Sequence, residues 1–332
     1  MKFHTEFDIK KLGIPIQHQH RLMLMGSCFT ENIGEKLSKH KFNILENPHG
    51  ILFNPVSVAE AITSYIDHSS ITEKDLFHYN EAWHSWKHHS RFSAMSSGES
   101  IQKINESISH AHDYLKEADY LMITLGSAWV YTLTKNASNA KLHSVVANNH
   151  KAPADWFSKK LLTVPDTLSV LDNVLHRLFL FNPKLQIIFT ISPVRHLREG
   201  VIENNRSKAV LIQTVHHLVD KFNKLYYFPA YELVIDDLRD YRFYAEDLVH
   251  PNYQATQYVW EKLIAACMNE ETQMLMKEIA EINRAYQHKP FNPDSNMHKI
   301  FLENYFNKTR ILIEKYPSLD LQKELRFFKK LN

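Results

Sequence analysis

A pair of nucleophilic residues follows what reads as the first buried strand of the chain. The stretch RLMLMGSCFTE, residues 21–31, runs from an apolar segment into Gly26, Ser27 and Cys28 and then into the start of a helix. The dipole and free N–H groups at such a helix start favour negative charge, which lowers a thiol pKa or stabilises a tetrahedral oxyanion. The pattern therefore predicts a nucleophile here, although a tight turn with a buried structural cysteine would give the same sequence.

An aspartate and a histidine stand three residues apart in FYAEDLVHPNYQA, residues 243–255. One turn can place Asp247 and His250 on the same side of the loop, just before a helix that begins near Asn252. Asp247 could then orient the imidazole, and His250 could act as a general base toward a nucleophile. The alternative is a loop with a capping aspartate and a surface histidine.

Strands and helices alternate between these two stretches. Short apolar runs without clean alternation indicate buried strands at 22–25, 120–125, 185–191 and 231–235. Apolar residues at helical spacing predict helices at 56–66, 100–118, 166–181 and 205–225. This order predicts a three-layer α/β/α sandwich with a central parallel sheet, which binds ligands at the carboxyl edge of its strands.

Three further segments interrupt or extend this pattern. We expect hairpin insertions at 76–93 and at 129–151, the second around a turn at 136–139, and helices from about residue 267 onward. The predicted organisation is an α/β domain at residues 1–266 followed by a helical extension at 267–332.

Composition excludes several classes of protein. Apolar residues make up 44% of the chain and charged residues 23%, which is typical of a globular protein, and a net charge of +2 gives no general attraction to nucleic acid. No window of apolar residues is long enough for a membrane span. Cys28 and Cys267 alone make no disulfide framework, and the N-terminus lacks the apolar core of a signal peptide, so we expect a cytoplasmic protein with free thiols.

Together the two stretches resemble the SGNH hydrolase superfamily, which has a Gly-Asp-Ser block near its first strand and Asp-x-x-His near its last. More narrowly, the chain is similar to the GSCFA family, whose name-giving motif reads Gly26-Ser27-Cys28-Phe29-Thr30 here. Other similar stretches, within a resemblance that spans roughly residues 20–265, are NPHGILFNP (47–55), ITLGSAWVY (123–131), VVANNHK (145–151), ISPVRH (191–196) and DLVHPN (247–252).

The resemblance implies roles for individual residues. Without a gap, Gly26 matches the glycine of the first block, Ser27 falls on the aspartate and Cys28 falls on the nucleophile. A shift by one residue would make Ser27 the nucleophile, and this alternative stays open. Asp247 and His250 match Asp-x-x-His, as the orienting carboxylate and the base.

The oxyanion hole of the superfamily is only partly matched. The superfamily uses the N–H of the nucleophile, a glycine N–H after the second strand and an asparagine in Gly-x-Asn after the third. Gly50 and Gly126 are the counterparts of the two glycines, but Ala128 stands at the asparagine position. Three side chains could substitute for it: Asn47, Asn54 and Ser127.

Aromatic and basic residues supply further candidates for substrate binding. Trp83, with Trp86, Arg91 and Phe92, could stack on a sugar or an acyl chain, or could simply pack on the sheet; Trp129 lies in the third matched block. The nearby histidines, His84, His88 and His89, lack a carboxylate or cysteine at ligand spacing, so neither a metal nor another cofactor is predicted.

Arg195 and His196 follow a central strand and should lie at the same sheet edge as the nucleophile. The arginine could bind a carboxylate or phosphate of the substrate. A salt bridge to Glu203 or Asp237 is an equal alternative.

These observations predict hydrolysis or transfer of an acyl group on a small or carbohydrate-like substrate, with no nucleic-acid or membrane partner. The C-terminal helices could also join two copies of the chain. The rival prediction is a non-catalytic binding or assembly protein, favoured by Ala128 and by the long helical tail. A redox role is less well supported because the sequence contains no CxxC.

Overall fold

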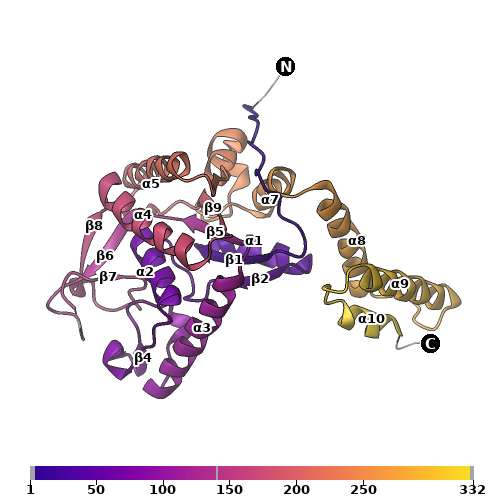
Figure 1. Ribbon diagram of the computed structural model, residues 1–332, viewed down its shortest axis with the longest axis horizontal. Coiled ribbons are helices and arrows are strands. Elements are labelled where there is room, and N and C mark those ends of the chain that lie inside the picture. Colours follow the sequence, from indigo (N-terminus) through magenta and orange to yellow (C-terminus); the bar gives the residue numbers. More distant parts are fainter. Residues whose placement is uncertain (1–3, 140, 330–332) are drawn as a thin grey trace.

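A parallel five-stranded sheet forms the centre of the protein (Figure 1). The computed structural model describes residues 4–139 and 141–329. The strands lie in the order β10-β9-β5-β1-β2. Their bounds are β1 Arg21–Gly26, β2 Asn43–Glu46, β5 Tyr120–Leu125, β9 Gln186–Ile191 and β10 Leu225–Tyr227. The chain passes from β1 to β2 on one side and to β5 on the other, so the order reverses at β1 and β5, which is where open α/β sheets bind their ligands.

Both faces of the sheet are covered by helices. Along β1, Leu22 and Leu24 enter one core and Met23 and Met25 the other, as the alternation of side chains in a strand requires. The first core contains side chains of α1 Cys28–Lys39 and α7 Tyr253–Cys267. The second contains those of α2 Pro55–Ile66, α3 Ser97–Glu117, α4 Val164–Phe181 and α5 Val201–Lys221. The predicted three-layer α/β/α sandwich is confirmed.

The two expected hairpins are present as small sheets beside the main one. The first pairs β3 Phe77–Tyr79 with β4 Ala82–His84. The second is a three-stranded sheet in the order β7-β6-β8, formed by β6 Trp129–Leu133, β7 Val145–Val146 and β8 Phe157–Leu161. Strand β8 was not predicted, and Ala140, within the expected second hairpin, lies outside the described residues.

The expected strand at 231–235 is wrong. This stretch is helical, as α6 Ala230–Glu232 followed by a π-helical segment, Leu233–Leu238, and the fifth strand is instead β10. A short apolar run cannot be assigned to strand or buried helix by periodicity alone. Leu233 and Val234 are fully buried against the same core as α1 and α7, which satisfies their apolar character within a helix.

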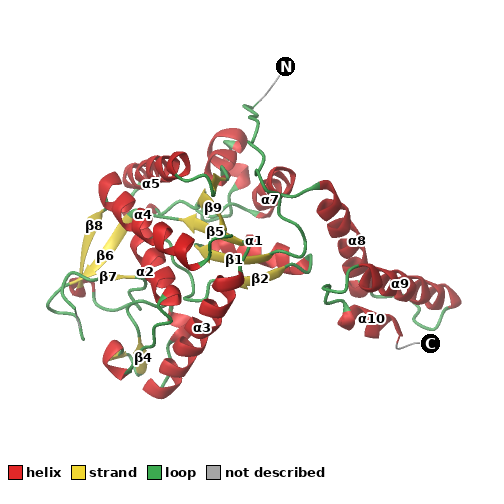
Figure 2. Ribbon diagram, viewed as in Figure 1, coloured by secondary structure: helices red, strands yellow, loops and turns green. Residues whose placement is uncertain are grey.

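The C-terminal helices form a cluster of their own at one side of the sandwich (Figure 2). They are α8 Glu270–Gln287, α9 Asn296–Lys315 and α10 Gln322–Lys329; residues 330–332 of the expected extension lie outside the described residues. Lys41 Nζ lies 2.7 Å from Glu324 Oε1 and links this cluster to the loop between α1 and β2. Within the described ranges, no helix combines the length and apolar character needed to cross a membrane.

Candidate active site

The junction between β1 and α1 requires glycine at position 26. Gly26 has a φ of +145°, and a Cβ at this position would lie 2.3 Å from the carbonyl oxygen of Thr124 on β5. The peptide groups of Gly26 are held from the β2 side, because its N–H donates to Asn47 Oδ1 at 2.9 Å and its oxygen accepts the N–H of Leu52 at 3.0 Å. These contacts fix where the next two residues lie.

Ser27 and Cys28 occupy different environments. Ser27 is 2% exposed, and its Oγ caps α1 by accepting the N–H of Phe29 at 3.3 Å. Cys28 is the first residue of α1 and is partly exposed. Of the two candidate nucleophiles, Cys28 is therefore the more exposed residue, and its side chain is not used as the helix cap.

Several groups act on the Cys28 thiol in opposite directions. Burial and the nearby Glu31 carboxylate raise its pKa, whereas the N–H groups of Cys28 and Phe29 and the charge of Lys208 lower it. Burial is the largest effect, so the pKa is raised overall and the resting thiol is protonated at neutral pH. An attack by Cys28 on a carbonyl carbon consequently needs a base.

Asp247 and His250 form a hydrogen-bonded pair. Nδ1 of His250 lies 2.6 Å from Oδ2 of Asp247, while Oδ1 accepts the N–H groups of Val249 and His250 at 2.9 and 3.0 Å. Leu248 adopts a left-handed φ of 56°, which lets the loop close around the carboxylate. The hydrogen bonds from the backbone and ring of His250 lower the pKa of Asp247 to about 2, so it is ionised and can hold the imidazole with Nε2 pointing away.

Lys208, on α5, is a site residue that the sequence analysis missed. It is 1% exposed, and its Nζ donates to the carbonyl oxygens of Gly126, after β5, and Ser192, after β9, at 2.7 and 2.6 Å. A signal was available, because Asn204, Ser207, Lys208, Leu211 and Val215 repeat at helical spacing and all turn out to be buried. A lysine within such a stripe cannot be an ordinary surface charge.

His196 is influenced by the charges of both Lys208 and His250. A Cβ on Gly126 would lie 3.0 Å from His196 Nε2, and that nitrogen is buried without a hydrogen-bond partner among the described residues. Burial, followed by the charges of Lys208 and His250, lowers the pKa of His196 to about 4, so the ring is neutral near pH 7. Lys208 thus acts electrostatically on both Cys28 and His196, and His250 acts on His196, while no hydrogen bond joins Cys28 to His250 among the described residues.

The expected oxyanion donors are mostly engaged elsewhere. The N–H of Gly50 donates to Asn47 O at 2.7 Å, so it is not free in this structure, and the N–H groups of Gly126 and Ser127 both donate to the carbonyl oxygen of Phe53. Asn54 caps α2 and donates from Nδ2 to Ser57 Oγ at 2.9 Å.

The other two candidate substitutes, Ser127 and Asn47, differ in whether they have a free hydrogen-bond donor. Ser127 Oγ pairs with Ser207 Oγ at 3.2 Å and accepts the N–H of Trp129. In contrast, Asn47 is 1% exposed, and its Nδ2 has no partner in the part of the chain that the structure describes. Of the three candidates for the missing donor at Ala128, only Asn47 retains a free buried N–H.

Arg195 faces aromatic rings instead of a carboxylate. Its guanidinium lies 4.3 Å from the ring centre of Tyr244 and 5.1 Å from that of Tyr241. The proposed salt-bridge partners are engaged elsewhere, Glu203 with Arg206 and Asp237 with His4. Arg195 therefore makes no salt bridge with either residue, and its side chain lines a cavity.

This cavity has a volume of about 350 Å³ and is lined by Arg195, Asp236, Tyr241 and Tyr244, among others. The N–H of Arg195 donates to Val249 O at 3.2 Å, so the cavity adjoins the loop that carries His250.

The two candidate tryptophans make packing contacts. Trp83 packs against the main core from the β3–β4 hairpin. Trp129 donates from Nε1 to Glu203 O at 3.3 Å, and Lys159 Nζ lies 4.6 Å from its ring centre. Both are half-buried and belong to the small sheets.

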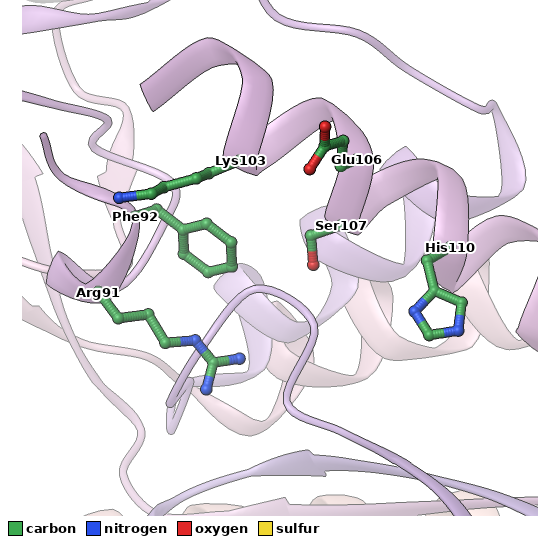
Figure 3. A pocket seen from close by; sticks show the side chains of 6 residues that line it. All are labelled: Arg91, Phe92, Lys103, Glu106, Ser107 and His110. Atoms are coloured by element: carbon green, nitrogen blue, oxygen red, sulfur yellow. The ribbon is translucent and has the colours of Figure 1, made fainter. Parts of the chain in front are cut away.

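A larger cavity of about 510 Å³ lies between α3 and the segment that carries Arg91 and Phe92 (Figure 3). Lys103, Glu106, Ser107 and His110 line it along α3 and face Arg91, which donates from Nη2 to Asn47 O. It shares no lining residue with the surroundings of Cys28 or His250. Among the described residues, no group of three His, Cys, Asp or Glu side chains is arranged to hold a metal ion.

Comparison with known proteins identifies the chain's family. The model of the GSCFA family matches residues 21–263, which is most of the chain. The chain belongs to the GSCFA family. A second model, described as the C-terminal domain of GSCFA domain proteins, matches residues 279–331. The motif after which the GSCFA family is named is thus the β1–α1 junction described above.

Solved structures include an acetyl xylan esterase from the rumen bacterium Butyrivibrio proteoclasticus that is similar to the chain. The similarity has a TM-score of 0.36 and 10% sequence identity, and it covers 76% of this chain and 64% of that one. A search of curated protein sequences gives no significant match.

Proposed function

We propose that this protein is an acyl hydrolase in which the Cys28 thiol is the nucleophile. The observation that carries the proposal is the contrast at the β1–α1 junction: Cys28 is partly exposed at the helix N-terminus, whereas Ser27 is buried as the cap. The junction lies at the reversal point of the strand order, where this class of sheet binds ligands. The Asp247–His250 pair supplies the base that a protonated thiol needs.

In the first half of the reaction, Nε2 of His250 takes the proton from Cys28 Sγ as sulfur attacks the ester carbonyl carbon. The tetrahedral intermediate collapses, the carbon–oxygen bond to the alcohol breaks, and His250 passes the proton to the leaving oxygen. A thioester on Cys28 remains. Asp247, already ionised, stabilises the imidazolium that forms in between.

In the second half, His250 takes a proton from water as the water oxygen attacks the thioester. The carbon–sulfur bond breaks, the carboxylic acid leaves, and His250 returns the proton to sulfur. One ester and one water are consumed. If the hydroxyl group of an acceptor takes the place of water, the same steps transfer the acyl group.

Two donors are proposed for the oxyanion. The N–H of Cys28 lies in the first turn of α1, where backbone N–H groups have no partner within the helix. Asn47 Nδ2 is the second, because it is buried and unpaired beside Gly26. It would take the role of the Gly-x-Asn asparagine of the SGNH hydrolase superfamily, whose position in this chain is occupied by Ala128.

The substrate is proposed to be an ester of a polar, carbohydrate-like alcohol. The cavity next to the His250 loop combines aromatic rings, Tyr241 and Tyr244, with charged groups, Arg195 and Asp236. Aromatic faces with hydrogen-bonding groups around them suit the alternating apolar and hydroxyl faces of a sugar.

The deciding experiment is the intact mass of the protein after exposure to p-nitrophenyl acetate. We expect one acetyl adduct on the wild-type protein and on Ser27→Ala, and none on Cys28→Ala. Cys267→Ala is the matched control, since Cys267 is fully buried and its loss should leave the adduct unchanged. His250→Ala should acylate much more slowly while retaining the circular dichroism spectrum of the wild type.

Each other outcome would contradict a specific part of the proposal. An adduct lost only in Ser27→Ala would move the nucleophile to Ser27. A wild-type protein that forms no adduct dependent on His250 would reject the hydrolase and favour a binding protein built on the same fold.

A further inference from the structure

Lys208 is a buried cation without a counter-ion. Its side chain is almost completely inaccessible, and no carboxylate in the described part of the chain pairs with it. Removing an ammonium group from water without an opposite charge costs free energy, so such lysines are rare unless the site uses them. The proposed function gives Lys208 no role.

The backbone groups that hold Lys208 lie at the ends of two strands on one side of β1, which leads into Cys28. The two carbonyl oxygens that hold its Nζ belong to Gly126 and Ser192, directly after β5 and β9, the two strands that follow β1 across the sheet. An ammonium group has three N–H bonds, and these oxygens accept only two. Cys28 is the group whose charge favours the ammonium form of Lys208, and Lys208 in turn favours the thiolate form of Cys28.

We propose that Lys208 compensates the negative charge that forms at Cys28, first on the thiolate and then on the oxyanion next to it. This inference rests on Cys28 being the nucleophile of the proposed function, and it assigns to a lysine part of the electrostatic role left open by Ala128. Lys208 acts on the reacting atoms through its field, without contact with the substrate.

The neighbouring charged groups make the effect specific. Glu31 opposes the thiolate, whereas the ring of His196 is neutral above pH 6 and adds no charge to the site there. Burial lowers the pKa of Lys208 to about 7. Its charge is therefore present below that value and is lost as the pH rises, with the loss delayed when Cys28 is a thiolate.

The test compares two alkylating reagents, anionic iodoacetate and neutral iodoacetamide, by the mass of the adduct on Cys28. Both react with the thiolate, so the ratio of their rates cancels the thiolate fraction and reports the local field. We expect the ratio in the wild type to be roughly threefold or more above that of free cysteine at pH 6. It should fall toward the free value by pH 9.

Lys208→Met removes the charge and keeps the length of the side chain. It should reduce the ratio to that of free cysteine and shift the alkylation pH profile of Cys28 upward, changes that a purely structural lysine would not produce. The matched control is Arg206→Gln, which removes an exposed charge, paired with Glu203, from the same helix and should change neither quantity.

An unchanged ratio in folded Lys208→Met would overturn the inference. If that variant does not fold, the wild type alone decides: a ratio equal to that of free cysteine at every pH, or a thiol that neither reagent reaches, would also overturn it. Because alkylation needs no acyl transfer, these outcomes are independent of whether the protein forms an acetyl adduct.

Discussion

The carboxylate of Asp247 is fixed by three hydrogen bonds, two from backbone N–H groups and one from the ring of His250. This arrangement leaves the imidazole one orientation, with its Nδ1 proton directed at the carboxylate. The nitrogen that faces away, Nε2, is then the unprotonated one and can accept a proton. The tautomer of His250 is thus set by a single side chain.

Asp247→Asn should slow acylation of Cys28 by about 10²–10⁴-fold with little effect on folding. An amide donates to Nδ1 instead of accepting from it, so the ring proton moves to Nε2 and the base is lost. The measurement is the single-turnover rate with p-nitrophenyl acetate. Asp113→Asn, an exposed aspartate on α3, is the control and should react at the wild-type rate. Equal rates in both variants would contradict this role for Asp247.

At the scale of single residues, the sequence is informative only where chemistry is local. Cys28 and the Asp247–His250 spacing are visible because each role depends on neighbours a few positions away. The free amide of Asn47 depends on its contact with β1, which no spacing reveals. Helical spacing indicates that Lys208 is buried, but it does not reveal that Nζ is held at the ends of β5 and β9.

At the scale of elements, the junction of β1 and α1 is the tightest point of the fold. Gly26 crosses β5 so closely that the carbonyl of Thr124 occupies the space of a side chain. Leu52 and Asn47 then hold the same peptide groups from the β2 side. Neither Thr124 on β5 nor the segment after β2 can move away from Gly26 without disrupting the sheet.

Gly26→Ala should lower the free energy of unfolding by roughly 3 kcal/mol or more, because the new methyl group meets backbone and not a flexible side chain. Urea denaturation measures the change. Gly98→Ala is the matched control, since Gly98 lies in the first turn of α3 with nothing within 4 Å of the new atom, and it should be neutral or slightly stabilising. A Gly26→Ala protein as stable as the wild type would refute the account.

In the main sheet, the long central strands were predictable and the short edge strands were not. Strands β5 and β9 are runs of buried apolar residues, and their ends match the sequence to within a residue. The edge strands β2 and β10 have four and three residues, too few to show a period. The apolar stretch at 231–235 was predicted as the last strand in place of β10, but it is helical because it packs within the core.

At the scale of the whole molecule, several histidines are buried in neutral form. Burial lowers the pKa of His88 to about 3 and those of His150 and His196 to about 4. His150 packs against Phe77 of β3, His88 stacks on His49, and His196 lies in the candidate site. Acid therefore acts on the insertions and on the sandwich together.

The folded state should lose stability as the pH falls from 6.5 toward 4. Unfolded histidines bind protons below their usual pKa of about 6.5, whereas the buried ones do so only near 3–4, so the unfolded state binds more protons in this range. The loss is about 1–2 kcal/mol per histidine at pH 5. Urea denaturation at pH 7.5 and pH 5 measures it, and His150→Gln should reduce the difference. Equal stability at the two pH values would contradict the prediction.

The C-terminal helices are joined to the sandwich in part by the ion pair between Lys41 and Glu324, whose side chains are only 20% and 6% exposed. Glu324→Gln should weaken this contact by about 1–3 kcal/mol, because a hydrogen bond between charged groups is lost. Faster hydrogen exchange in α9 and α10, with unchanged exchange in β5, is the expected result. Glu314→Gln, in an exposed pair with Arg310, should show no such change, and the same behaviour in both variants would exclude the link.

The two thiols differ so strongly in burial that the number of reactive thiols reports whether the chain is folded. Cys267, the last residue of α7, is fully inaccessible, while Cys28 is partly exposed. A thiol-counting reagent should therefore find one sulfur per native chain and two per denatured chain. The stoichiometry of a preparation then reads directly as its fraction of correctly folded molecules, before any substrate is known.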